Sequence, residues 1–291
     1  MNFKPMLSAT LTEDLFPTLR FPLLLSPKLD GFRCIAWNGV AYSRNAKPIR
    51  NAFIQKWAAD KHNLDGELIV GSPTDPNCFG NTSSGVTSAA GKPDFTYHLF
   101  DCIEGISPDF ESRLDRVQSE YYGCPKMRNV PHAHCDNQEL VLRYEKFYLS
   151  EGYEGIMLRS PDGPYKHGRS TMREQYLMKF KRFVDGEAKV IRLEEGRHNG
   201  NEAFTDELGR TKRQTLAENM TGNGMVGTLI CMDPIWGEIR VSAGKMTHHT
   251  REHYWHNPTE LIGQTIHWRS FGYGTKDAPR FARFYGVVDH D

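Results

Sequence analysis

Lys28 is the residue of this sequence whose surroundings most clearly suggest chemistry. It lies in a polar turn between two apolar segments, and Glu67, Glu154, Lys179 and Lys181 follow it along the chain. A lysine amine attacks phosphorus only when nearby cations or loss of water lower its pKa. Residues two apart share a face of a strand, so Lys179 and Lys181 would point the same way as a phosphate clamp. A single Lys-x-Asp-Gly is more often a charged strand end entering a turn, so the prediction of Lys28 as a covalent nucleophile depends on the whole set.

Acidic residues near strand ends are candidates for holding a nucleotide and a metal ion. Glu67 and Glu154 each lie next to a short apolar run, where a carboxylate can accept a hydroxyl or bind Mg²⁺. Asp30 completes the set of candidate metal ligands. Phe100 ends another apolar run and could stack on a base, although most such phenylalanines belong to the core. Each acid taken singly is more often a solvated turn residue.

Two regions of different character must position these residues. From Phe21 to about Phe183 strands alternate with amphipathic helices, including helices over 49–60 and 110–121 and strands over 67–70, 97–103 and 155–158. Beyond about 185 five strands are predicted with one helix, which fits an OB-fold barrel. The strands are expected at 188–193, 225–232, 238–242, 264–269 and 280–288, and the helix at 250–262. We therefore predict an α+β protein with a domain of mixed β-sheets and helices over 1–185 and a β-barrel over 186–291.

Composition limits the remaining possibilities. The formal net charge is zero, so a nucleic-acid partner would have to be held by local clusters of Lys and Arg. The six cysteines are scattered and form no C-x-x-C pair, which indicates reduced thiols. The N-terminal residues lack the apolar run of a signal peptide, and no stretch is long enough to span a bilayer. We expect a cytoplasmic, monomeric protein with no membrane partner.

A histidine cluster offers a competing chemistry. His248, His249, His253 and His256 fall on the predicted helix, and histidines four apart can bind zinc. No H-E-x-x-H motif is present, and aromatic neighbours indicate a packed helix face. We favour an ordinary helix with exposed histidines.

The ordered motifs resemble those of the covalent nucleotidyltransferase superfamily, and most closely those of minimal ATP-dependent DNA ligases of the Chlorella virus type. Six motifs in order are a strong signal where one would be weak. The similarity extends over essentially the whole chain. The motifs are Lys28-Leu29-Asp30-Gly31-Phe32-Arg33, Ser43-Arg44-Asn45, Asp65-Gly66-Glu67, Phe100-Asp101, Glu154-Gly155-Ile156-Met157 and Lys179-Phe180-Lys181.

This resemblance implies an adenylation domain followed by an OB-fold and a three-step reaction. Lys28 would form a lysyl-AMP from ATP, AMP would pass to the 5′-phosphate of a nick in double-stranded DNA, and the 3′-hydroxyl would displace it. Mg²⁺, or Mn²⁺, would be held by Glu154. The implied roles of the other residues are ribose binding by Glu67, stacking on adenine by Phe100, an adenine-edge contact by Ser26, α-phosphate binding by Lys179 and Lys181, and contacts to the phosphates of the nick by Arg33, Arg44, Arg169 and Arg173.

The resemblance also implies two features of the C-terminal domain. Residues 196–224 occupy the place of a hairpin latch that closes around DNA, with Arg210, Lys212 and Arg213 as basic residues. Such a hairpin grips phosphates without reading bases. The last predicted strand resembles the motif that orients pyrophosphate, but the chain lacks the terminal Asp-Lys of many relatives. Lys276, Arg280 and Arg283 are the candidates for that role.

Other functions share part of this pattern. An RNA-capping guanylyltransferase or an RNA ligase would use the same lysine, glutamates and lysine pair. An NAD-dependent ligase is disfavoured because only 27 residues precede Lys28. A non-catalytic OB-fold DNA-binding protein would be expected to lose the catalytic set, yet every position of that set is filled.

Overall fold

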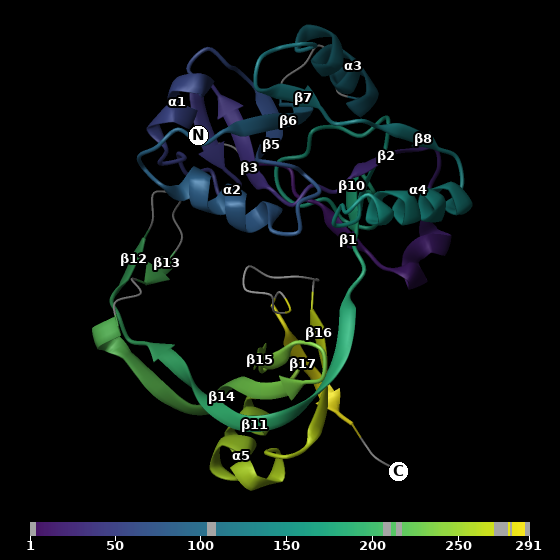
Figure 1. The fold of residues 1–291 in the computed structure, drawn as a ribbon. Helices are drawn as coiled ribbons and strands as arrows, with labels where there is room; N and C mark the ends of the chain where they lie inside the picture. Colours follow the sequence, from purple (N-terminus) through teal and green to yellow (C-terminus); the bar gives the residue numbers. More distant parts are fainter. Residues whose placement is uncertain are drawn as a thin grey trace. The chain divides into compact units, whose positions relative to one another are not determined.

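The chain folds into two compact units, Met1–Arg182 and Phe183–Asp291 (Figure 1). The computed structural model describes residues 4–103, 109–205, 211–213, 217–270, 279 and 281–288, with the backbone alone at 204, 205, 211, 212 and 217. The boundary along the sequence falls after Arg182, slightly before the one expected at 185, because strand β11 of the second unit already begins at Val184.

The N-terminal unit contains two five-stranded sheets. The first has the order β1-β10-β9-β2-β8, and its apolar side packs with helix α4 (Gln138–Ser150) into one core. Asn137 begins that helix because its side chain accepts a hydrogen bond from the Leu140 N–H at 3.0 Å. The strands are β1 (Ala9–Leu11), β2 (Leu23–Pro27), β8 (Ala133–Cys135), β9 (Ile156–Arg159) and β10 (Leu177–Phe180), with a 3-10 helix, η1 (Glu13–Thr18), between β1 and β2.

The second sheet of this unit has the order β4-β3-β5-β6-β7 and a separate core. Its strand β6 alternates buried and part-exposed residues along most of its length, the pattern of a sheet with one buried face. Helix α1 begins after Asn51, whose side chain accepts from the Ile54 N–H at 3.0 Å, so the predicted helix over 49–60 is confirmed in a shorter form. The elements are β3 (Phe32–Trp37), β4 (Val40–Ser43), α1 (Ala52–Ala58), β5 (Leu64–Val70), α2 (Cys78–Thr87), β6 (Phe95–Cys102), α3 (Phe110–Glu120) and β7 (Met127–Asn129).

The C-terminal unit is built on a closed barrel of five strands in the order β11-β14-β15-β17-β16, as predicted for an OB-fold. Two of its strands are much longer than expected, because they continue beyond the barrel toward the β12–β13 hairpin. The elements are β11 (Val184–Asn199), β12 (Ala203–Thr205), β13 (Thr211–Arg213), the 3-10 helix η2 (Ala217–Asn219), β14 (Met220–Asp233), β15 (Gly237–Ser242), α5 (His248–His256), the 3-10 helix η3 (Pro258–Glu260), β16 (Thr265–Ser270) and β17 (Arg283–Val287).

The helix predicted over 250–262 was wrong at both ends. Helix α5 runs from His248 to His256, and a 3-10 turn follows at Pro258. Proline has no N–H for an α-helical hydrogen bond, which explains why the α-helix stops before it. Trp255 and Tyr254 pack against the barrel core while all four histidines are exposed, as expected. Among the described residues no group of three His, Cys, Asp or Glu side chains is placed to hold a metal ion.

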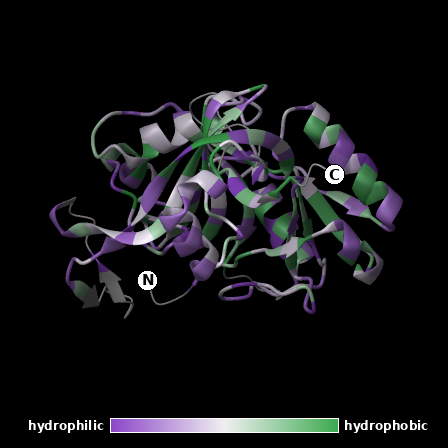
Figure 2. Cartoon of the chain, turned by 90° about the horizontal axis from the view of Figure 1, so that it is seen from below, coloured by the Kyte–Doolittle hydropathy of each residue, from purple (hydrophilic) through white to green (hydrophobic). Residues whose placement is uncertain are grey.

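Figure 2 shows hydrophilic and hydrophobic residues side by side on the helices. Within the described parts of the chain, no helix combines the length and the apolar composition needed to cross a membrane. All six cysteines are free thiols, and five of them are buried, as the scattered spacing predicted.

Candidate active site

Lys28 directly follows strand β2, and its backbone continues the pairing of β2 with β9. The Lys28 N–H donates to the Gly155 carbonyl at 2.8 Å, and the Glu154 N–H donates to the Lys28 carbonyl at 3.3 Å. Gly155 has a φ of +150°, and a Cβ there would lie 2.5 Å from the Phe180 carbonyl oxygen. Only glycine allows this close approach. The local backbone therefore brings Lys28, Glu154 and Lys181 together.

One carboxylate links the two lysines of the site. Glu154 forms ion pairs with Lys28 through Oε2 and with Lys181 through Oε1. The three side chains are 14%, 21% and 10% exposed, respectively, so water screens these pairs only partly. Burial alone would raise the pKa of Glu154, but Lys28 and Lys181 lower it below its ordinary value. The carboxylate is consequently held in its charged form by two ammonium groups.

Lys179 lies on β10 opposite Met157 of β9, two residues from Lys181. Its pKa is lowered, first by burial and then by the positive charges of Lys28, Arg44 and Arg169. No acidic side chain of the described residues forms an ion pair with it. A group of neighbouring cations favours the approach of an anion with several charges.

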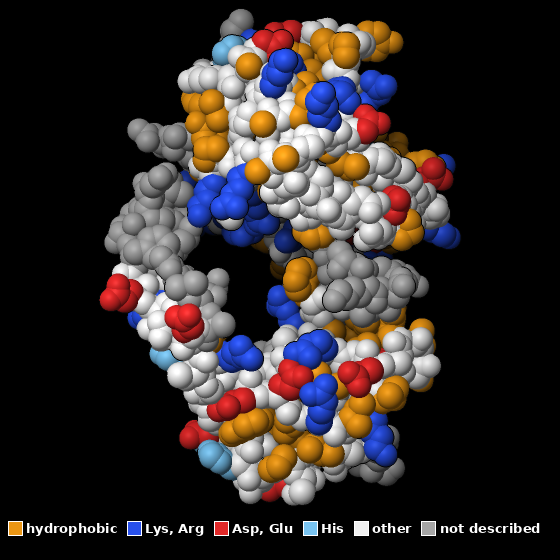
Figure 3. All heavy atoms as spheres, turned by 60° about the vertical axis from the view of Figure 1, so that its left-hand side comes forward, with side chains coloured by type: hydrophobic (Ala, Val, Ile, Leu, Met, Phe, Trp, Pro, Cys, Tyr) orange, Lys and Arg blue, Asp and Glu red, His pale blue; other side chains and the backbone are white. Residues whose placement is uncertain are grey.

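Two exposed arginines, Arg44 and Arg169, lie near Lys179. The pKa of Arg44 is lowered by partial burial and then by Arg169 and Arg33. Arg169 donates through Nη1 to the Ser8 carbonyl at 2.6 Å, which holds its guanidinium on the surface. Lys and Arg side chains are also seen gathered on this unit in Figure 3. We call the set of Lys28, Arg33, Arg44, Arg169, Lys179 and Lys181 the cationic cluster.

Arg173 is not among these neighbours. Its carbonyl accepts from Arg20 at 2.7 Å, and none of the shifted pKa values in the cationic cluster has Arg173 as a main cause. The structure therefore brings five of the six predicted phosphate-binding cations of the N-terminal domain, together with Lys28, into one neighbourhood, and Arg173 is not a main cause of the lowered pKa values of Arg44 and Lys179.

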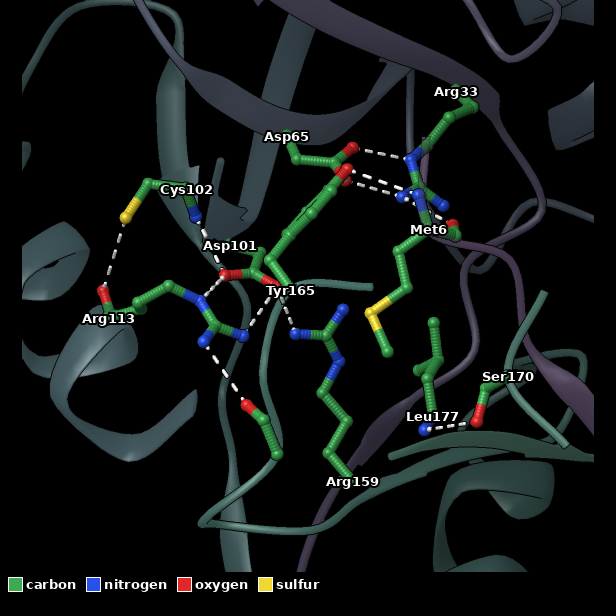
Figure 4. A network of polar contacts seen from close by, with 11 residues as sticks. Met6, Arg33, Asp65, Asp101, Cys102, Arg113, Arg159, Tyr165, Ser170 and Leu177 are labelled. Carbon is green, nitrogen blue, oxygen red and sulfur yellow. Dashed lines mark hydrogen bonds and ion pairs between the residues drawn. The ribbon is translucent and has the colours of Figure 1, made fainter. Parts of the chain in front are cut away.

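Arg33 is held by a carboxylate to which the sequence analysis gave no role. Its Nε and Nη2 donate to Asp65 Oδ1 and Oδ2, each at 2.5 Å (Figure 4). Burial would lower the pKa of Arg33, but fully buried Asp65 raises it above its ordinary value. The Arg33 guanidinium also lies over the Phe100 ring, 4.7 Å from its centroid.

A β-bulge places Phe100 beside Arg33. Asp65 of β5 pairs with Asp101 of β6, but the next residue, Gly66, pairs with Leu99, so Phe100 has no partner across the strands. Bulges of this kind redirect a side chain and are frequent next to functional sites. Ser26, expected at the adenine edge, is buried in β2.

Glu67 faces the same neighbourhood from β5, where it pairs with Arg33 of β3. Burial raises the pKa of Glu67 to about 7, although Arg33 and Lys28 act in the opposite direction. With Asp30 and Glu154 it was predicted to bind a metal, but among the described residues no three acidic, His or Cys side chains are grouped as metal ligands.

The raised pKa of part-buried Glu67 makes the stability of the protein depend on pH. The folded pKa exceeds that of the unfolded chain, so the protonated form stabilises the fold below the unfolded pKa, and this contribution is lost as the pH rises through about 7. Glu67→Gln cannot ionise. We subtract the free energy of unfolding of the original protein from that of the variant. This difference should increase by roughly 2 kcal/mol when the pH is raised from about 5 to about 8. Urea unfolding at several pH values measures this, and a difference that does not change with pH would contradict it.

Several predicted residues of the C-terminal unit cannot be placed. Arg210, Lys276 and Arg280 lie outside the described residues, and Lys212 is described by its backbone alone. Arg213 of β13 donates to the Asn201 carbonyl at 2.5 Å, and Arg283 lies on β17. The predicted latch at 196–224 contains the far ends of β11 and β14 and the β12–β13 hairpin.

A lysine at a strand end, one glutamate paired with two lysines, and a separate five-stranded barrel are the features expected of the covalent nucleotidyltransferases. Residues 5–181 match the family model of the ATP dependent DNA ligase domain. The chain belongs to this family.

Individual relatives agree with this assignment over part of the chain. The DNA ligase of African swine fever virus is 23% identical over 139 residues, which are 46% of this chain and 32% of that protein. The DNA ligase of Methanococcus maripaludis is 30% identical over 71 residues, 24% of this chain and 12% of that protein. The matched stretches thus span about a third or less of these relatives.

Solved structures are similar over almost the whole chain. The Chlorella virus DNA ligase-adenylate is 27% identical with a TM-score of 0.55, covering 99% of both chains. A Lig E DNA ligase is 22% identical with a TM-score of 0.71, covering 99% of this chain and 100% of that one. The similarity to the Lig E DNA ligase concerns the fold alone.

Proposed function

We propose that this protein is an ATP-dependent DNA ligase that seals nicks in duplex DNA and works as a monomer. The observation that carries the proposal is the grouping of Lys28, Glu154 and Lys181 at the joined ends of β2, β9 and β10, with Lys179 and the arginines of the cationic cluster around it. The similarity to the Chlorella virus enzyme, whose structure is that of a DNA ligase-adenylate, supports the same conclusion.

In the first step the Lys28 Nζ would attack the α-phosphorus of ATP. An N–P bond forms, the bond to the bridging oxygen breaks, and pyrophosphate leaves. The amine attacks only without its extra proton, so its ion pair with Glu154 must open first. Lys179 and Lys181 would hold the α-phosphate oxygens, where negative charge must be stabilised in the transition state.

Opening that ion pair would free Glu154 for a metal ion. Mg²⁺ is commonly bound through one or two carboxylates together with substrate phosphates. This fits a site that offers Glu154 but, within the described part of the chain, no preformed set of three ligands. The ion, or Mn²⁺ in its place, would neutralise phosphate charge. Asp30 and Glu67 remain proposed as contributors.

The adenosine would occupy the side of the site formed by β5 and β6. Glu67 would accept a ribose hydroxyl, Phe100 would stack on adenine, and Ser26 would lie at the adenine edge. One face of the Phe100 ring already contacts the Arg33 guanidinium, so the base would take the other face or displace it.

The nick would be held through its phosphates. After AMP passes to the 5′-phosphate, the 3′-hydroxyl attacks that phosphorus and AMP leaves. Arg33, Arg44 and Arg169 are proposed to contact these phosphates, because a neutral protein needs such a local cluster to bind a polyanion. Arg173 and the basic residues of the hairpin are proposed as more distant contacts, and pyrophosphate orientation stays assigned to Lys276, Arg280 or Arg283.

The test is the intact mass of the purified protein after separate incubations with ATP, GTP and NAD plus Mg²⁺. We expect one AMP adduct from ATP alone, which nicked duplex DNA discharges while the strand is sealed. A GMP adduct would instead indicate a capping enzyme, and an adduct from NAD would overturn the cofactor assignment. No adduct, in a preparation shown to be free of AMP, would favour a non-catalytic DNA-binding protein.

A further inference from the structure

The Arg33 guanidinium is part of a closed ring of hydrogen bonds (Figure 4). Asp65 accepts two hydrogen bonds from Arg33, and its Oδ2 also lies 2.6 Å from the Tyr165 hydroxyl. The Tyr165 oxygen lies 3.3 Å from the Met6 N–H, and the Met6 carbonyl accepts from Arg33 Nη2 at 3.3 Å. Four residues that are far apart in the sequence thus hold one another in place.

The direction of these hydrogen bonds is fixed. The Met6 N–H can only donate, so the Tyr165 oxygen accepts there. Its single hydroxyl proton is then available for Asp65, which as a carboxylate can only accept. Burial, and then the charge of Asp65, raise the pKa of Tyr165 well above its ordinary value, so the hydroxyl keeps this proton at neutral pH.

The same N-terminal segment also holds a second arginine of the cationic cluster. Leu7 donates to the Gly168 carbonyl, and Ser170 donates to the Leu7 carbonyl, both at 2.7 Å. On one side of Leu7 the Met6 carbonyl binds Arg33, and on the other the Ser8 carbonyl binds Arg169. The segment 6–8 therefore connects the two guanidinium groups through a short piece of fixed backbone.

We propose that Tyr165 is a positioning residue for nick sealing, which acts through Asp65 and the Met6 backbone to hold the Arg33 guanidinium in register with Arg169. The inference rests on the function proposed above. Without the hydroxyl, Asp65 and the Met6 N–H each lose a partner, while the direct Arg33–Asp65 pair remains. Arg33 then keeps its charge but loses its fixed orientation, and misplacement by about 1 Å can cost a hundredfold in rate.

The test compares Tyr165→Phe with the original protein in single-turnover sealing of a nicked duplex. We expect the rate to fall about ten- to a hundredfold, the equivalent of one hydrogen bond to a charged group. In an Arg33→Lys background the same change should alter the rate less than about threefold, because a group that acts through Arg33 has nothing left to orient. Equal losses in both backgrounds would overturn the proposal.

Tyr97→Phe is the matched control. The Tyr97 hydroxyl is also buried and donates to a backbone carbonyl, that of Cys34, at 3.1 Å. Its loss should lower the melting temperature but leave the sealing rate within about twofold, whereas similar rate losses in the two tyrosine variants would show a merely structural effect. If the original protein does not seal nicks, the proposed function fails. If it seals them and Tyr165→Phe is unaffected, only the positioning role fails.

Discussion

Lys28→Ala should form no AMP adduct from ATP and should seal no ordinary nick, a loss beyond about a thousandfold because the covalent step has no substitute. The variant should still close a nick that already carries a 5′-adenylate, since that step uses the other cations of the site. Its fold should be preserved, because Glu154 keeps its ion pair with Lys181 when Lys28 is removed. Intact mass reports the first step, and single-turnover assays on both nicked duplexes report the others.

Lys126→Ala provides the control for loss of a lysine charge. Lys126 lies in the same unit and pairs with exposed Asp94 at 2.9 Å, outside the cationic cluster. Its variant should form the adduct and seal nicks at the original rate. An AMP adduct that persists in Lys28→Ala would show that another residue is the nucleophile, and inactivity on the adenylated nick would indicate a damaged site rather than a missing nucleophile.

Lys28, Glu154 and Lys181 could be predicted to lie together because each lies beside the end of a short apolar strand. The same reasoning was wrong for Glu67, which lies within β5 and not at its end. A strand pattern says where an end falls, and neighbouring strand ends gather at one edge of a sheet. Gly155 also contributes, because its missing side chain lets Lys181 approach Glu154. The sequence shows a glycine at this position but not the close approach that requires it. The five-stranded barrel was predictable in the same way, from strand count and spacing.

The contacts that orient Arg33 could not be predicted from spacing. Asp65 is the first residue of the Asp-Gly-Glu motif, but its pairing with Arg33 depends on the register of β3 with β5. Tyr165 and Met6 are separated by 159 residues, and no local pattern links them. The bulge at Phe100 breaks strict alternation, so period-two reasoning fails there. The available signal for Asp65 was a second acid two residues from a predicted site residue, Glu67, in the same strand.

The contacts of Asp101 could not be predicted from spacing either, and their loss should cost more stability. It is fully buried and pairs with Arg113, whose Nε lies 2.8 Å from Oδ1, and with Arg159 through Oδ2 (Figure 4). Both arginines are also buried, on α3 and β9, so one carboxylate joins the second sheet, a helix and the first sheet. Burial would raise the pKa of Asp101, but Arg159 and Arg113 lower it below its ordinary value.

Asp101→Asn should therefore destabilise the N-terminal unit by about 3–5 kcal/mol, because two buried guanidinium groups lose their counter-charge. The sign of the pH dependence follows from the lowered pKa. The stabilisation by Asp101 is present above the pKa of the unfolded chain and is lost as the pH falls through the folded value. The difference between the two proteins should consequently shrink in acid.

Urea unfolding of the full chain, with hydrogen exchange read on peptides of β6 and β9, measures this difference in the N-terminal unit itself. Asp94→Asn, immediately before β6, is the control, since Asp94 is 99% exposed and its pair with Lys126 should contribute no more than about 1 kcal/mol. A loss at Asp101 as small as that at Asp94 would mean that the two arginines find other partners, and that the network around Asp101 does not hold the two sheets together.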